Sequence, residues 1–82
     1  MAKKNYSVHY YANHSLLLVN SSGIIRQLFT PFKVRCDVDV GRFKAGSYLY
    51  VEEVAPGEKY ELIYHIGDGA YYHKYFRITA NF

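Results

Sequence analysis

This chain is short of several residue types on which small domains often depend. Its 82 residues include no tryptophan, one methionine, two prolines and one cysteine, Cys36. Because a secreted domain of this size usually carries several paired cysteines, a single thiol favours a cytoplasmic protein without an internal disulfide. The longest apolar run, residues 16–19, is far shorter than the roughly 20 residues of a membrane-spanning helix, so no membrane partner is expected. The first residues also do not resemble a secretory signal.

Acidic residues are absent from the chain before Asp37, although seven follow and the net charge is +3. Basic residues lie on both sides of this acidic middle: Lys3, Lys4, Arg26, Lys33 and Arg35 precede it, and Lys74 and Arg77 follow it. If the two basic ends pair in space, they form one face that attracts phosphates or an acidic protein. An ordinary solvated mixture of charges is the plainer interpretation.

Recognisable catalytic and cofactor motifs are missing from the sequence. It contains no GxxxxGK[ST] phosphate loop, no GxSxG elbow and no HExxH pair. Cys36 occupies the inward phase of a strand, which does not suit a thiolate nucleophile. The four histidines include no pair at a familiar metal-ligand spacing, so we expect neither a metal nor another cofactor. The sequence therefore predicts a protein that is not an enzyme.

The chain is rich in alternation of apolar and polar residues, the pattern of half-buried strands. It is clearest over residues 32–40, where the predicted inner side includes Cys36 and Val38. Residues 60–66 and 76–82 show the same period. These three segments are predicted as strands.

Two further segments also favour strands, with less regular patterns. Residues 5–11 alternate tyrosine and valine with smaller or polar residues. Residues 47–54 are rich in strand-forming residues, but their phase changes before Val54. A bulge near Glu52 and Glu53 would return Val54 to the core.

The segment before Pro31 allows two structures. Residues 15–19 and 24–29 are apolar and flank the turn-forming residues 20–23, which favours a hairpin. The alternative is one short helix near residues 22–29, capped by a serine and ended before the proline.

Short strands joined by glycine-containing turns indicate an all-β fold in a single domain over residues 1–82. We expect a small antiparallel barrel or sandwich of about five to seven short strands. The order of strands and turns over roughly residues 32–80 resembles an SH3-like barrel. That resemblance implies a tight bend at residues 71–76 ahead of a closing strand, with Phe76 in the core.

Ten tyrosines and four histidines are the compositional excess of the chain. Tyrosine offers a large, rigid contact area with a hydroxyl that tolerates water, and it is enriched at protein interfaces. It also stacks on unpaired bases beside basic residues, although sheets favour tyrosine in any case. We therefore predict a partner-binding face formed by His9, Tyr11, Tyr71, Tyr72, His73, Lys74, Tyr75 and Arg77.

Three functions follow from this composition. The first is a non-enzymatic protein-binding module or small protein inhibitor that presents the tyrosine- and histidine-rich face to a larger partner. An inhibitor carried by a virus or mobile element would have this size and composition. The second is an RNA or single-stranded DNA binder, with the same tyrosines as stacking platforms and the basic ends on phosphates. The third is a structural subunit of an assembly.

The polar side of residues 32–40 also suggests a homodimer. Two copies paired antiparallel about Cys36 would set Lys33 opposite Asp39 and Arg35 opposite Asp37. The competing prediction is that this strand is paired inside its own sheet, because an unprotected edge is normally avoided.

Overall fold

A computed structural model describes residues 6–59 and 61–79 of the chain. Within these residues the fold is all-β, with nine strands and a single 3-10 turn, η1 (His73–Tyr75). The strands form three small antiparallel sheets, with orders β1-β2-β3, β5-β4-β9 and β6-β7-β8. These sheets do not close into one barrel. No helix within the described ranges is long and apolar enough to cross a membrane.

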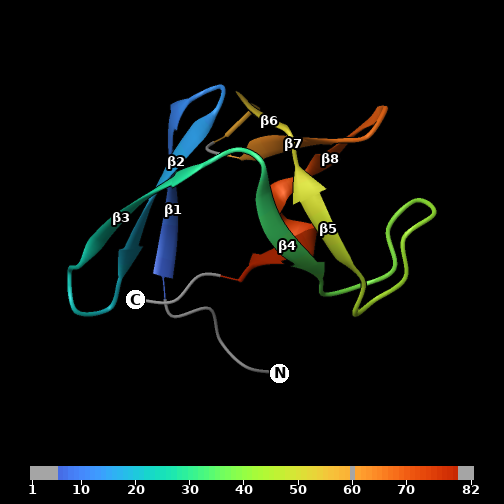
Figure 1. The fold of residues 1–82 in the computed structure, drawn as a ribbon, viewed down its shortest axis with the longest axis horizontal. Helices are drawn as coiled ribbons and strands as arrows, with labels where there is room; N and C mark the ends of the chain where they lie inside the picture. The colour runs from blue at the N-terminus through green and yellow to red at the C-terminus, as the bar shows by residue number, and fades with distance from the viewer. Residues whose placement is uncertain (1–5, 60, 80–82) are drawn as a thin grey trace.

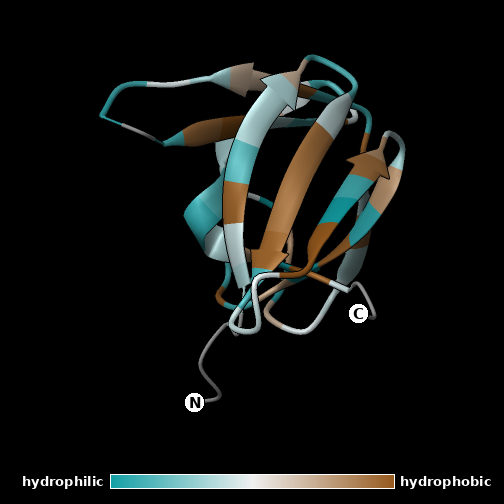
Figure 2. Ribbon diagram, turned by 90° about the vertical axis from the view of Figure 1, so that its left-hand side faces the viewer, coloured by the Kyte–Doolittle hydropathy of each residue, from teal (hydrophilic) through white to brown (hydrophobic). Residues whose placement is uncertain are grey.

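The first sheet contains β1 (Tyr6–Ala12), β2 (Ser15–Asn20) and β3 (Ile25–Phe29), on the left of Figure 1. β2 is its central strand and is hydrophobic over most of its length, as Figure 2 shows. The side chain of Asn20 accepts hydrogen bonds from the backbone N–H groups of Ser22 (3.0 Å) and Ile24 (2.9 Å) and so stabilises the β2–β3 turn. The predicted hairpin is therefore confirmed, and the alternative helix near residues 22–29 is wrong.

The other two sheets share a continuous stretch of chain. The second contains β4 (Phe32–Cys36), β5 (Tyr48–Val51) and β9 (Phe76–Ile78), and the third contains β6 (Glu53–Pro56), β7 (Leu62–Ile66) and β8 (Gly69–Tyr72). β5 and β6 are separated by Glu52 alone, so this segment passes from one sheet to the next. Val51 and Val54 are both fully buried. The phase change predicted near Glu52 and Glu53 is confirmed.

The number of strands differs from the expected five to seven for two reasons. The segment predicted as one strand over residues 47–54 is divided into β5 and β6. In addition, residues 69–72 pair with β7 as β8, although a bend was expected from residue 71. The bend before the last strand is η1, which begins at His73.

One core lies between the sheets and is filled by alternate residues of the strands. Its buried hydrophobic members are Leu16, Leu18, Phe32, Val34, Cys36, Val51, Val54, Leu62, Tyr64, Ile66, Phe76 and Ile78. Burial of each large side chain stabilises the fold by about 1.5–3 kcal/mol. The predicted inner residues Cys36 and Phe76 are confirmed as core. Tyr60 and Phe82, from two predicted strands, lie outside the described residues.

The strand predicted over residues 32–40 ends at Cys36, and the prediction that Val38 is buried is wrong, because 44% of Val38 is exposed. The ladder between β4 and β9 stops at the hydrogen bond from Asp37 N–H to the carbonyl of Tyr75 (2.9 Å), because Tyr75 belongs to η1 and β9 begins only at Phe76. A carboxylate oxygen of Asp39 then accepts from Ala45 N–H (2.8 Å) and holds the loop over residues 37–47. This loop projects on the right of Figure 1.

The proposed pairing of two copies about Cys36 is not available in this fold. β4 is the central strand of its sheet, with β5 on one side and β9 on the other. Both edges next to Lys33 and Arg35 are therefore occupied, while Asp37 and Asp39 belong to the loop. The competing prediction, that this strand is paired inside its own sheet, is confirmed.

Candidate binding site

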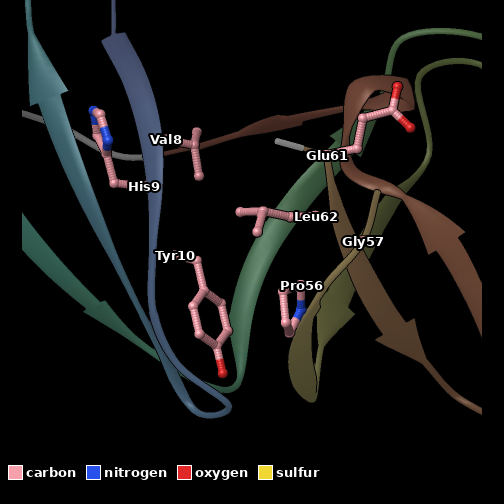
Figure 3. A pocket seen from close by; sticks show the side chains of 7 residues that line it. All are labelled: Val8, His9, Tyr10, Pro56, Gly57, Glu61 and Leu62. Atoms are coloured by element: carbon pink, nitrogen blue, oxygen red, sulfur yellow. The ribbon is translucent and has the colours of Figure 1, made fainter. Parts of the chain in front are cut away.

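A cleft of about 340 Å³ lies between β1 and the connection from β6 to β7. We refer to it below as the cleft. Its described lining residues are Val8, His9, Tyr10, Pro56, Gly57, Glu61 and Leu62. Figure 3 shows Val8 and Tyr10 between β1 and Leu62, with Pro56 opposite Tyr10. These side chains give the cleft an apolar centre.

The cleft follows from strand alternation in β1. Residues two apart project to the same side of a strand, so Val8 and Tyr10 lie on the side of β1 that borders the cleft (Figure 3). Val8 is half-buried and Tyr10 is partly open to solvent, while His9 is exposed on the other side. The hydroxyl of Tyr10 donates to Oδ1 of Asn13 (2.8 Å), which fixes the ring at one end of the cleft. Leu62, on the other wall, is buried. The hydroxyl of Tyr10 and its partner Asn13 therefore lie at the margin of the cleft.

The 3-10 turn η1 is tied to this wall by a histidine. The backbone N–H of Leu62 donates to Nδ1 of His73 (3.0 Å), so Nδ1 carries no proton in this arrangement. The ring of His73 also packs edge-on to that of Tyr64, with centroids 6.3 Å apart. His73 therefore positions η1 relative to the cleft.

An aromatic cluster is formed by η1 and the residue before it. The rings of Tyr72 and Tyr75 lie edge to face with centroids 6.4 Å apart. Nζ of Lys74 is 5.4 Å from the first ring centroid and 5.7 Å from the second. The same Nζ is 3.3 Å from Oε1 of Glu61, which lines the cleft. Tyr72, Lys74 and Tyr75, called the Tyr72 cluster below, are therefore continuous with the cleft.

The structure separates the predicted site residues into groups. His9, Tyr72, His73, Lys74 and Tyr75 lie in or next to the cleft and the Tyr72 cluster. Tyr11, Tyr71 and Arg77 lie elsewhere.

The remaining three predicted residues have different surroundings. Tyr71 turns inward, with its ring centroid 5.4 Å from that of Phe43 and 6.2 Å from that of Phe76. Arg77 is half-buried on β9, with Nε 3.6 Å from Oδ1 of Asp37. Tyr11 is 59% exposed but is not among the described residues that line the cleft.

Sequence reasoning did not find most of the cleft. Val8 and Tyr10 are two residues apart in a predicted strand and therefore share one side of it, which indicated the wall formed by β1. The other wall follows the turn that begins after Pro56. The sequence gives no indication that this turn lies beside β1, because the two segments belong to different sheets.

Burial favours the protonated forms of two internal side chains, the Tyr64 hydroxyl and the Cys36 thiol. It raises the pKa of the Tyr64 hydroxyl, and nearby Tyr6 raises it further. It also raises the pKa of the Cys36 thiol, with Asp37 and Asp39 acting in the same direction. The Cys36 thiol therefore stays protonated at neutral pH and is a poor nucleophile.

No candidate metal site is found in the described part of the chain. Over residues 6–59 and 61–79, no group of three or more histidine, cysteine or acidic side chains is placed to hold a metal ion. The chain matches no known family model, and comparisons with curated proteins and with solved structures found no match. The geometry of the site is therefore the basis for the proposal that follows.

Proposed function

We propose that this protein is a non-enzymatic protein-binding module or small inhibitor that holds a short segment of a larger partner in the cleft. The observation that carries this proposal is the contact between Glu61 and Lys74, which joins the apolar cleft to the Tyr72 cluster. An apolar centre with a polar, tyrosine-bearing margin is the usual anatomy of a protein interface.

The size and edges of the cleft also support a peptide segment as the ligand. Its volume of about 340 Å³ is near the lower limit of roughly 300–1,000 Å³ for ligand pockets, which suits an apolar side chain. Among the described strands, β1 is hydrogen-bonded to β2 alone within its sheet. An extended partner segment can therefore add backbone hydrogen bonds along β1 while its side chain enters the cleft.

Nucleic-acid binding is less favoured at this surface. The ammonium of Lys74 is engaged by the carboxylate of Glu61, which would also repel a phosphate. Arg77, the other cation expected to assist, lies on β9 beside Asp37. The carboxylate of Glu61 instead suits a partner with a basic or hydrogen-bond-donating group next to its apolar side chain.

The architecture that we propose for residues 32–78 is SH3-like. It is supported by the two sheets that β5 and β6 connect, and by η1 directly before the final strand β9. The proposed setting is the cytoplasm, where a lone thiol such as Cys36 stays reduced.

A display library of short random peptides tests the proposed function. We expect the enriched peptides to share an apolar residue and to lose at least tenfold in affinity for Tyr72→Ala/Tyr75→Ala, because interface tyrosines often contribute more than about 1.4 kcal/mol. Tyr10→Ala should weaken the same peptides. Tyr48→Ala/Tyr50→Ala is the matched control and should not change their affinity. Failure to enrich any peptide that depends on the cleft residues would contradict the proposal.

A further inference from the structure

A second tyrosine-bearing surface lies on the outward side of the sheet β5-β4-β9. The register sets Arg35 of β4 opposite Tyr48 of β5, and Lys33 opposite Tyr50. On the other side of β4, Arg35 stands opposite Arg77 of β9. Directly opposed residues of antiparallel strands project to the same side. These two tyrosines and three cations therefore share one face, called the basic sheet face below.

The tyrosines of the basic sheet face are open to solvent. Tyr48 is 57% exposed and Tyr50 is 58% exposed, more than the 43% of Tyr72 beside the cleft. Lys33 and Arg35 are exposed as well. Nζ of Lys33 lies 4.6 Å from the centroid of the Tyr48 ring. The face therefore offers accessible rings with positive charge directly beside them.

The register places two of the cations directly opposite each other. Like charges directly opposite on neighbouring strands destabilise a sheet, and Arg35 and Arg77 occupy such a pair. Asp37 offsets part of this repulsion, because its Oδ1 is 3.6 Å from Nε of Arg77. Lys33 and Arg35 are on the solvent side of the same strand. A bound anion would relieve this concentration of positive charge.

We propose that the basic sheet face binds an unpaired nucleic-acid strand, with bases on the two tyrosines and phosphates on Lys33 and Arg35. Alternate strand residues are about 6.6 Å apart, roughly twice the 3.4 Å rise per base of a stacked strand. Tyr48 and Tyr50 therefore suit bases of an extended, unstacked strand. A base that stacks on Tyr48 replaces the ammonium of Lys33, which then reaches a phosphate.

The exposed rings distinguish this ligand from other anions. Cations alone would serve a duplex or an acidic peptide, but neither of these presents free base faces to a tyrosine. Stacking and phosphate contact are common to DNA and RNA, and the proposed contacts include none to the sugar. We therefore expect single strands of either sugar to bind alike. This inference concerns a different sheet from the cleft and does not depend on the peptide-binding proposal.

Fluorescence titration of the full chain with labelled oligothymidylate, at several salt concentrations, tests the inference. We expect binding at low salt with a log–log salt slope of about −1.4, since Lys33 and Arg35 each neutralise one phosphate and each phosphate of a single strand contributes roughly −0.7. A duplex of equal length should bind several-fold more weakly. Lys33→Gln should reduce the magnitude of the slope by about 0.7.

Variants of the tyrosines separate stacking from charge. Tyr48→Ala/Tyr50→Ala should weaken binding by about tenfold or more for each ring, because one stacked base is worth roughly 1–3 kcal/mol. Tyr48→Phe/Tyr50→Phe keeps the rings and should keep the affinity. Tyr48→Thr/Tyr50→Thr preserves strand propensity if the alanine variant does not fold. Tyr72→Ala/Tyr75→Ala is the matched control on the other surface.

Three results would overturn the inference. The first is no binding of oligothymidylate at low salt. The second is equal binding of the duplex or of polyglutamate, which would show a response to charge alone. The third is unchanged affinity in folded variants that lack both rings.

Discussion

The cleft and the basic sheet face present the same residue type in opposite surroundings. In the Tyr72 cluster, the rings pack against each other and their lysine is held by Glu61. On the basic sheet face, Tyr48 and Tyr50 stand side by side with cations opposite them. The first surface combines an apolar hollow with an acid, and the second combines open rings with positive charge.

This difference shows that a tyrosine count does not identify a ligand. A tyrosine serves a protein interface when its neighbours exclude water and provide a hollow for an apolar group. It serves an unpaired nucleic acid when its face is free and phosphate-binding groups are near. The neighbours of each ring, set by strand register, therefore decide the function that we assign to each surface.

The largest effect is expected when the core shared by both surfaces is damaged. Phe76 is buried, and its ring centroid is 6.0 Å from that of Tyr64 on β7, so it connects the two sheets. Phe76→Ala should lower the free energy of unfolding by about 3–5 kcal/mol. Denaturant unfolding should show one transition, with both ligands lost together. Loss of one ligand with full retention of the other would show that the surfaces do not share a core.

A smaller effect, confined to the cleft, is expected from His73→Ala. Removal of Nδ1 leaves the N–H of Leu62 without this acceptor, which should cost about 1–3 kcal/mol and weaken peptide binding. Oligothymidylate affinity should not change. His73→Asn restores an acceptor and should recover part of the loss. The exposed His9→Ala is the control for stability, with an expected change in the free energy of unfolding within about 0.5 kcal/mol, and an equal loss of stability in this control would contradict the role of His73.

Alkaline pH should lower the stability of the fold through the core tyrosine Tyr64. The pKa of Tyr64 is raised by burial, so above about pH 10 the unfolded state loses a proton that the folded state keeps. The contribution of this group to the free energy of unfolding is therefore complete below about pH 10. Above that pH it falls by about 1.4 kcal/mol per pH unit. Tyr64→Phe should reduce that slope in a pH series of denaturation curves.

The smallest effect is expected at the ion pair that joins the cleft to the Tyr72 cluster. Because the Lys74 and Glu61 side chains are both partly exposed, Lys74→Ala should cost only about 0.2–1 kcal/mol of stability. Peptide affinity should nevertheless fall, since the rings of the Tyr72 cluster lose their shared cation. Unchanged peptide affinity in this variant would separate the cluster from the cleft.

Local alternation in the sequence predicted most of the strands. Cys36 and Phe76 were identified as core because one side of a strand must be apolar. The end of β4 was not predicted, because the hydrogen bond from Asp37 to the carbonyl of Tyr75 joins residues far apart in the chain. Val38 therefore keeps the apolar phase in the sequence and is exposed in the fold.

The two surfaces could be predicted only in part. The predicted partner-binding face included both Tyr71 and Tyr72, of which Tyr72 is exposed and Tyr71 turns inward. Tyr48 and Tyr50 lie in a segment that was predicted as a strand, but they were not chosen as a site. Their importance comes from the register with β4, which alternation within a single strand does not determine.

The most direct test of two separate surfaces is a pair of amide chemical-shift titrations on the labelled protein. Oligothymidylate should shift amides of β4 and β5, including those of Lys33 and Tyr50. A cleft-selected peptide should instead shift amides of β1 and η1, including that of Tyr10. Perturbation of one common set of amides by both ligands would contradict the account.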